Sequence, residues 1–153
     1  MTAQLDRRLH PVRPDLASAA YRGQVDAERF VEGTEFSVAA DKVELRARPE
    51  LSCGIDTEVN FGETFQVFES TSDGWSWGQL ATDGYVGWLP TSALGTIETA
   101  THRVAALRTY RYPEAEMKRP VLGRFRWGLS YALLAMKRHG GWSSPNWQMA
   151  PSW

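Results

Sequence analysis

The sequence predicts a mainly β protein made of small barrel modules, and three observations carry this prediction. Apolar and aromatic residues alternate with polar ones over short runs, which is the pattern of half-buried strands. Turn-forming Gly, Asp and Pro residues separate these runs. The 153-residue chain also holds seven tryptophans, whose large side chains fill a barrel that has few core positions. A chain of this length can form one domain or two small ones.

Residues 1–33 are expected to form an N-terminal arm that leads into a short helix. Pro11 and Pro14 restrict the residues before them to extended backbone, so this arm should lie along a surface. Asp15 can cap a helix, and Gly33 can end it. The apolar residues after the cap have an approximately helical spacing: Leu16, Ala19, Ala20, Val25 and Phe30.

A first barrel is predicted over residues 34–96. Phe36–Ala39 and Val43–Ala47 have the composition of strands around an Asp-Lys turn. A long loop is expected from Arg48 to Ile55, because it contains Pro and Gly and lacks alternation. Glu63–Glu69 alternates again and is predicted to be a strand.

The clearest strand signal is a hairpin between Asp73 and Leu94. Trp75 and Trp77 lie two residues apart and should share one strand face, and so should Val86 and Trp88. The Asp-Gly pair between them tolerates the positive φ angles of a tight turn. We therefore expect two paired strands, with Val86 and Trp88 on one face and Tyr85 on the other, where its hydroxyl could serve a ligand.

Residues 97–153 are predicted to repeat the first barrel incompletely. Leu107-Arg108 is similar to Leu45-Arg46, and Gly141-Trp142 is similar to Gly74-Trp75. No counterpart of the first barrel's closing strand follows, so we expect a partial second copy with a truncated or altered C-terminus. A sheet edge left unpaired in this way can be covered by a second protomer.

Charge and composition narrow the classes of partner and compartment. The formal net charge of −1 gives no general attraction to nucleic acid or to an anionic membrane. No apolar run approaches the roughly 20 residues that cross a bilayer, and the first residues lack the apolar stretch of a secretory signal. A single cysteine excludes an internal disulfide framework. We expect a soluble cytoplasmic protein.

Four strings over about fifty residues resemble a bacterial SH3 domain: VELRARP, FGETFQVF, GWSW and GYVGWLP, in this order. The resemblance implies an SH3-like small barrel for residues 34–96. It also implies that the second, partial copy over residues 97–153 has the same fold.

A narrower resemblance covers nearly all of the chain. The strings LDRRL, RPDL, RFVEG and THRVAALRTY around the barrel are similar to the N-terminal half of NlpC-type cysteine endopeptidases that cut murein peptides, the γ-D-glutamyl-L-diamino acid endopeptidases of dipeptidyl-peptidase VI type. In that family the first SH3 domain helps to recognise the free N-terminal L-Ala of the peptide. Tyr85 matches the family's tyrosine, and either Glu50 or Glu63 is implied as its acidic neighbour. The family's catalytic Cys and His lie in a following hydrolase domain that this chain does not reach, so the resemblance implies a substrate-shaping module that does not hydrolyse the peptide alone.

Three other functions stay open from the residues. Trp75, Trp77, Tyr85 and Trp88 have the composition of an aromatic groove for peptides, which would make a stand-alone protein-binding module. The same rings are also needed simply to fill a small barrel. Cys53 could be a nucleophile, but no helical pattern follows it to lower its thiol pKa, so a catalytic role is disfavoured. The basic stretch 102–139 could bind RNA, stacking bases on its aromatic residues.

No metal or cofactor is expected. His10, His102 and His139 have no ligand spacing to one another, and one cysteine cannot supply a multi-cysteine site.

Overall fold

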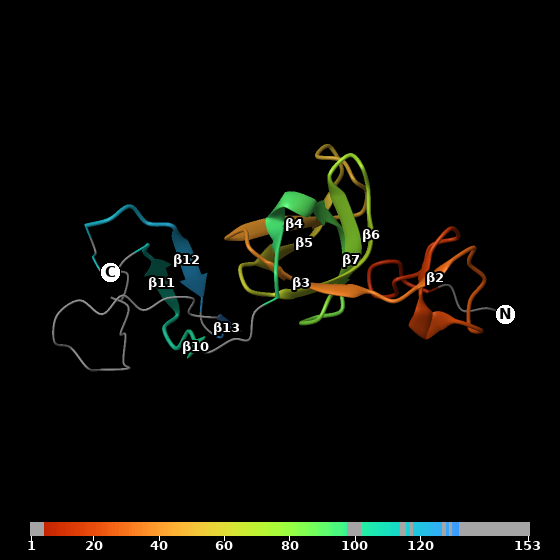
Figure 1. Cartoon of the computed structure of the whole chain (residues 1–153), viewed down its shortest axis with the longest axis horizontal. Helices are drawn as coiled ribbons and strands as arrows, with labels where there is room; N and C mark the ends of the chain where they lie inside the picture. The colour runs from red at the N-terminus through yellow and green to blue at the C-terminus, as the bar shows by residue number, and fades with distance from the viewer. Residues whose placement is uncertain are drawn as a thin grey trace. The chain divides into compact units, whose positions relative to one another are not determined.

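The computed structural model describes residues 5–97, 102–113, 116, 118–126, 128, 130 and 131. The chain divides into two compact units, Met1–Ile97 and Glu98–Trp153. Strands form most of the regular structure in both units, and the described residues contain no α-helix (Figure 1). The mainly β fold predicted from the sequence is therefore confirmed.

A seven-stranded antiparallel sheet forms the body of the first unit, with the strand order β5-β4-β8-β7-β6-β3-β9 (Figure 1). Its strands are β3 (Thr34–Val38), β4 (Lys42–Arg46), β5 (Ile55–Asn60), β6 (Thr64–Ser70), β7 (Trp75–Leu80), β8 (Val86–Pro90) and β9 (Leu94–Gly95). A short 3₁₀ turn, η2 (Thr91–Ala93), precedes β9. Because β5 and β9 are edges, the hydrogen-bonded ladder does not close on itself as the predicted barrel would.

The predicted hairpin forms as β7 and β8. Leu80 donates its N–H to the Tyr85 carbonyl at 2.9 Å, and the Tyr85 N–H is bound by the Asp83 carboxylate at 3.0 Å. Gly84 has a φ of 77°, the left-handed value that the turn was expected to need. The sequence prediction missed strand β5, because its polar residues interrupt any clear alternation.

Two apolar clusters lie on the two faces of this sheet. The first core consists of the buried residues Val38, Leu45, Val59, Phe65, Val67, Leu80 and Leu89. The second core consists of Leu16, Phe68, Trp77, Val86 and Trp88, with Val31 and Trp75 packed against it. Both predicted same-face pairs of the hairpin thus lie together in or against the second core.

A β-bulge in β6 allows this strand to supply both cores. Val67 is opposite Gly78 and Glu69 is opposite Trp77, so Phe68 is the extra residue between them. Val67 is buried in the first core and Phe68 in the second. The ring of Phe68 lies 5.7 Å from that of Trp77.

The predicted N-terminal helix is wrong. Its place is taken by β1 (Ala17–Ser18), the 3₁₀ turn η1 (Ala19–Tyr21) and β2 (Phe30–Val31), where β1 and β2 pair in parallel. The Asp15 carboxylate binds the Arg13 guanidinium at 2.6 and 3.0 Å, and Ala17 donates its N–H to the Arg29 carbonyl at 2.9 Å. Pairing with other segments therefore overrides the helical spacing of the apolar residues.

The second unit is described in two antiparallel pairs. β10 (His102–Arg103) pairs with β13 (Ser130–Tyr131), and β11 (Arg108–Arg111) pairs with β12 (Gly123–Arg126). Leu107 is 84% exposed, whereas its proposed counterpart Leu45 is fully buried. The match of Gly141-Trp142 lies outside the described residues, and the repeat stays a prediction.

Candidate functional site

The N-terminal arm, residues 5–13, crosses the start of β8 and makes backbone contacts there. Val86 donates its N–H to the Arg8 carbonyl at 2.7 Å. The amide of Gln79 donates to the Leu9 carbonyl at 3.1 Å. The arm thus lies along a surface, as its prolines predicted, and that surface belongs to the β7–β8 hairpin.

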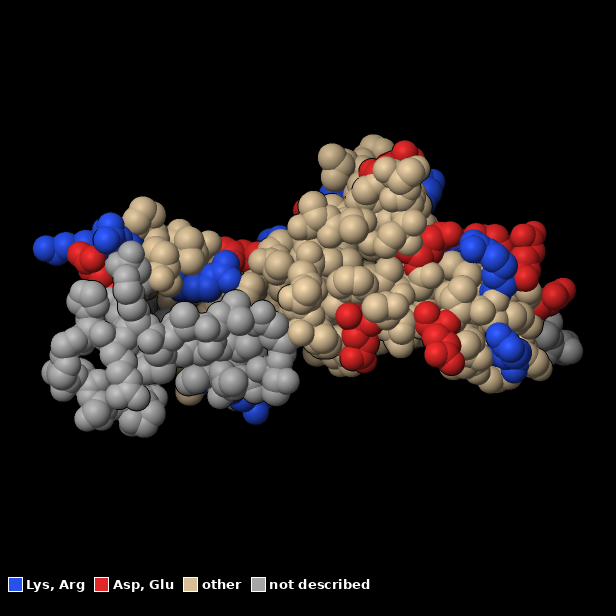
Figure 2. Space-filling model, in the orientation of Figure 1, with Lys and Arg blue, Asp and Glu red and all other residues tan. Residues whose placement is uncertain are grey.

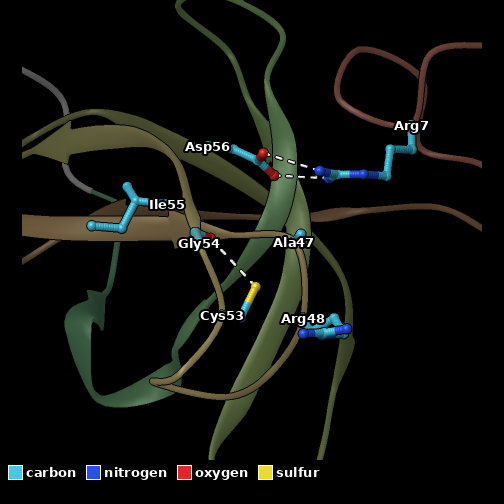
Figure 3. A pocket seen from close by; sticks show the side chains of 7 residues that line it. All are labelled: Arg7, Ala47, Arg48, Cys53, Gly54, Ile55 and Asp56. Atoms are coloured by element: carbon cyan, nitrogen blue, oxygen red, sulfur yellow. Dashed lines mark hydrogen bonds and ion pairs between the residues drawn. The ribbon is translucent and has the colours of Figure 1, made fainter.

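Arg7 fixes the arm to strand β5. Its guanidinium makes two parallel hydrogen bonds to the Asp56 carboxylate, at 2.8 and 3.0 Å, and Figure 3 shows the two groups facing each other. Asp56 is in a bulge, because Leu45 is opposite Thr57 while Arg46 is opposite Ile55. A bulge redirects the extra side chain, which here turns toward the arm. The hydrogen bond to Asp56 is also the main reason why the pKa of Arg7 is raised.

An open hollow of about 490 Å³ lies beside this ion pair (Figure 3). Its lining residues come from the arm and from the β4–β5 loop: Arg7, Ala47, Arg48, Cys53, Gly54, Ile55 and Asp56. Guanidinium groups and a carboxylate therefore border one space that is open to solvent, and the buried Cys53 lies in its wall.

Cys53 does not have the surroundings of a catalytic cysteine. The residue is only 7% exposed, and its thiol donates to the Gly54 carbonyl at 3.3 Å. No imidazole bonds to it among the described residues; His10 instead binds the Asp6 carbonyl at 3.0 Å through Nδ1. Since an activated thiolate needs a base in reach, the described part of the chain offers no support for a cysteine hydrolase acting through Cys53.

Tyr85 packs against the first core from the turn before β8, on the face opposite Val86 and Trp88 as predicted. Its hydroxyl makes no hydrogen bond to any residue that the structure describes. Arg8 of the arm is close by: its pKa is raised mainly by a hydrogen bond to Asp6, and further by Tyr85.

The two acidic candidates, Glu63 and Glu50, differ in their burial and in the groups that their carboxylates already contact. Glu63 is half-buried, and its carboxylate accepts from the backbone N–H of Asn60 at 2.6 Å, which stabilises the β5–β6 turn. Glu50 is exposed on the β4–β5 loop and pairs with Arg48 at 2.7 Å. Arg48 lines the hollow, so Glu50 lies next to that space while Glu63 serves the turn.

The hairpin tryptophans are on the opposite face and are covered by the arm. Trp77 is 4% exposed and Trp88 is 8% exposed, whereas Trp75 is half-buried at the margin of the second core. The guanidinium carbon of Arg13 lies 4.4 Å from the ring centroid of Trp77 and 5.2 Å from that of Trp88. The tryptophans therefore lie together in a largely buried cluster that a cation of the same chain covers, and Tyr85 does not belong to it. The aromatic peptide groove stays a prediction.

Two carboxylates complete the surroundings of Arg13. Its Nη2 atom donates to Asp15 and to Glu69, each at 2.6 Å. Burial disfavours the charged guanidinium, but these two hydrogen bonds outweigh it, so the pKa of Arg13 is raised. The same pairing lowers the pKa of the Asp15 carboxyl. Arg29 also approaches Glu69, at 3.3 Å.

Several aromatic residues of the basic second unit already pack against other residues of that unit. Phe125 is buried and cannot stack on a base, while Arg124 lies over the Tyr110 ring at 5.7 Å. Tyr110 and Tyr112 pack edge to face at 6.4 Å. Trp127 lies outside the described residues, and RNA binding remains a prediction.

Figure 2 shows carboxylates gathered over the N-terminal segments of the first unit.

No group of three or more His, Cys, Asp or Glu residues that could hold a metal ion occurs in the described part of the chain. Among the same residues, no helix is long and apolar enough to cross a membrane.

Sequence reasoning missed four residues that organise these sites: Arg7, Arg13, Asp56 and Glu69. The sequence did contain a signal for the ion pair of Arg13 with Asp15, because Pro14 between them favours a turn that brings the two side chains together. Nothing local marks Glu69 or Asp56, since each is placed by a bulge whose position depends on the partner strand.

A small antiparallel sheet with a tryptophan-rich hairpin and a crossing arm defines the first unit as an SH3-like domain. Residues 45–94 match the family model described as the bacterial dipeptidyl-peptidase SH3 domain. This part of the chain is therefore an SH3 domain of the bacterial type. No curated protein sequence matches the chain.

Proposed function

We propose that the first unit is a non-catalytic module of a murein-peptide endopeptidase, which shapes the site for the N-terminal part of a cell-wall peptide in the cytoplasm. The match of residues 45–94 to a dipeptidyl-peptidase SH3 domain is the observation that carries this proposal. The hydrolysis itself belongs to a separate domain, in the same polypeptide or in another. The open hollow lined by Arg48 supports recognition of a ligand, and Tyr85 is half-buried at the margin of the first core.

The ligand chemistry fits the charged and polar groups of the β4–β5 loop and of the β7–β8 turn. A peptide such as L-Ala-γ-D-Glu-diaminopimelate has a free amine at one end and several carboxylates. Glu50 is the better partner for the amine, because its ion pair with Arg48 is exposed and can be exchanged for a ligand, whereas the half-buried carboxylate of Glu63 stabilises the β5–β6 turn. Arg48 provides positive charge for a carboxylate, and the Tyr85 hydroxyl is available to donate or accept a hydrogen bond.

Isothermal titration calorimetry of the full chain with this tripeptide tests the proposal. Tyr85→Phe should weaken binding about fivefold, which corresponds to one net hydrogen bond of about 1 kcal/mol. Glu50→Gln should weaken it by a similar or larger factor because the amine is charged. Tyr110→Phe, in the second unit, is the matched control and should leave the Kd unchanged.

Two further ligands sharpen the outcome. An N-acetylated tripeptide should bind less tightly than the free amine, and incubation of either peptide should release no dipeptide. Equal affinity of the parent and of Tyr85→Phe for the free peptide, or release of the dipeptide by this chain alone, would overturn the proposal.

A further inference from the structure

The peptide unit before Tyr85 is held at both of its polar groups by side chains. The carbonyl of Gly84 accepts a hydrogen bond from the side-chain amide of Gln79 at 2.9 Å. The N–H of Tyr85 donates to the Asp83 carboxylate at 3.0 Å. Because the backbone has two soft dihedral angles per residue, bonds at both ends of a peptide unit restrict the direction in which the next side chain leaves the chain.

The peptide unit after Tyr85 is held by strand β7 and by the arm. Its carbonyl accepts from the Leu80 N–H at 2.9 Å. Its N–H, which belongs to Val86, donates to the Arg8 carbonyl at 2.7 Å. Strand β4 pairs with β8 at Trp88, so the Arg8 carbonyl takes the place that a strand partner would have at Val86. Since Val86 is only 2% exposed, its N–H needs this acceptor, and the arm is part of the structure that carries Tyr85.

Gln79 joins the arm to the turn through a single nitrogen. Its Nε2 atom donates to the Gly84 carbonyl at 2.9 Å and to the Leu9 carbonyl at 3.1 Å. A primary amide has two N–H groups on one nitrogen and can therefore serve two carbonyl oxygens at once, whereas a glutamate of the same size would present only acceptors to them. The half-buried Gln79 is thus the side chain through which the arm holds the peptide unit before Tyr85.

We propose that Gln79 is a positioning residue of the ligand site at Tyr85, and that the arm sets the affinity of this site by holding the turn through Gln79. This inference rests on the function proposed above, because it concerns the recognition of the peptide by Tyr85. Both amide hydrogens of Gln79 are used within the chain, so the residue acts through Tyr85 rather than on the ligand.

A double-mutant cycle separates this role from a general loss of structure. Calorimetric titration of the full chain with L-Ala-γ-D-Glu-diaminopimelate should give a Kd about fivefold higher for Gln79→Glu than for the parent. In the Tyr85→Phe chain, which already lacks the hydroxyl, the same change should raise the Kd by less than about twofold, because the two residues act as one unit.

Two further variants control for charge and for folding. Gln24→Glu makes the same change in an exposed amide that donates to the Ala20 carbonyl at 2.8 Å, and it should leave the Kd unchanged. Gln79→Met removes both donors without adding a charge, and it replaces Gln79→Glu if that chain does not fold. It should raise the Kd by a similar factor, and urea unfolding shows which chains are folded.

Hydrogen exchange measured by NMR provides a readout that needs no ligand. In Gln79→Met the arm loses its contact at Leu9, so the Val86 amide should exchange at least about tenfold faster than in the parent. The amide of Leu89, which is fully buried further along β8, is the internal reference and should exchange at a nearly unchanged rate.

The outcomes distinguish the two proposals. Equal affinity of the parent and of Tyr85→Phe would overturn the proposed function and this inference with it. A loss of affinity in Tyr85→Phe combined with an unchanged Kd in the Gln79 variants would overturn only the positioning role. The same holds if the effect of Gln79 persists in full in the Tyr85→Phe chain, or if the Val86 amide exchanges as slowly in Gln79→Met as in the parent.

Discussion

The guanidinium carbon of Arg13 lies 4.4 Å from the ring centroid of Trp77, and this contact connects the N-terminal segment to the outer face of the sheet. The same guanidinium is hydrogen-bonded to Glu69 of strand β6. Arg13 is therefore held by strands β6 and β7, which are far from it in the sequence. Segments that sequence analysis separates into an arm and a barrel therefore share one core.

Loss of this side chain should destabilise the first unit. Arg13→Ala removes the stacked cation and leaves Glu69 without its closest partner, so we expect a loss of about 2 kcal/mol in the free energy of unfolding. Urea unfolding followed by tryptophan fluorescence measures it. Arg29→Ala is the control, because Arg29 approaches the same carboxylate from an exposed position, and it should cost at most about 0.5 kcal/mol.

Gly87 should not tolerate a side chain. A Cβ atom there would lie 2.7 Å from the Arg46 carbonyl oxygen and 2.8 Å from Leu45 Cγ, in the place where β8 meets β4. Gly87→Ala should therefore cost about 1–3 kcal/mol in urea unfolding. Gly54→Ala has open space around its Cβ and should change the unfolding free energy by less than about 0.5 kcal/mol. Equal costs for the two variants would contradict the close approach of these strands.

The carboxyl groups of the arm should make the protein less stable in acid. Hydrogen bonds from Arg8 lower the pKa of Asp6 from 3.8 to about 2, and Arg13 lowers the pKa of Asp15. The folded state thus binds fewer protons than the unfolded state between about pH 4 and pH 2, so this stabilisation is complete above pH 4 and is lost as the pH falls through that range.

NMR titration of the side-chain carboxyl carbons checks this directly. Asp6 should titrate near pH 2 in the parent chain and move toward 3.8 in Arg8→Gln, which lacks the guanidinium that binds it. An Asp6 pKa that is the same in both chains would show that the pair does not form in solution.

Cys53 should react slowly with thiol reagents in the folded protein. Its side chain is buried beside the β4–β5 loop, and a reagent gains access only when this loop opens. We expect iodoacetamide labelling, followed by mass spectrometry, to be at least about tenfold slower in buffer than in 8 M urea. A thiol that reacts as fast folded as unfolded would contradict the burial and would reopen a chemical role for Cys53.

The features that depend on neighbouring residues were the ones that sequence could predict. The β7–β8 hairpin follows from its turn and from the spacing of Trp75 and Trp77, both of which are local. The placement of Tyr85 opposite Val86 and Trp88 follows from strand alternation. These features held because a two-residue period leaves little freedom once the strand is formed.

The features that depend on partners were missed. Residues 15–30 have a helical spacing of apolar residues, but their backbone groups form hydrogen bonds with other segments. The spacing of neighbouring residues does not predict such hydrogen bonds. The position of Arg13 over the tryptophan rings was missed for the same reason, since tertiary packing determines which residue contacts them. Asp56 is the extra residue of one bulge and Glu69 follows the extra residue of another, and bulges shift the alternation by one residue without any mark in the sequence.

The extra residue in β6 has one more consequence. Phe68 and Glu69 are consecutive, yet both serve the same side of the sheet, the ring beside Trp77 and the carboxylate beside Arg13. A strictly alternating strand could offer one of these groups to that side but not both. The extra residue thus allows the ring of Phe68 and the carboxylate of Glu69 to lie on the same side, and deleting one residue after Val67 would separate them while leaving Val67 opposite Gly78.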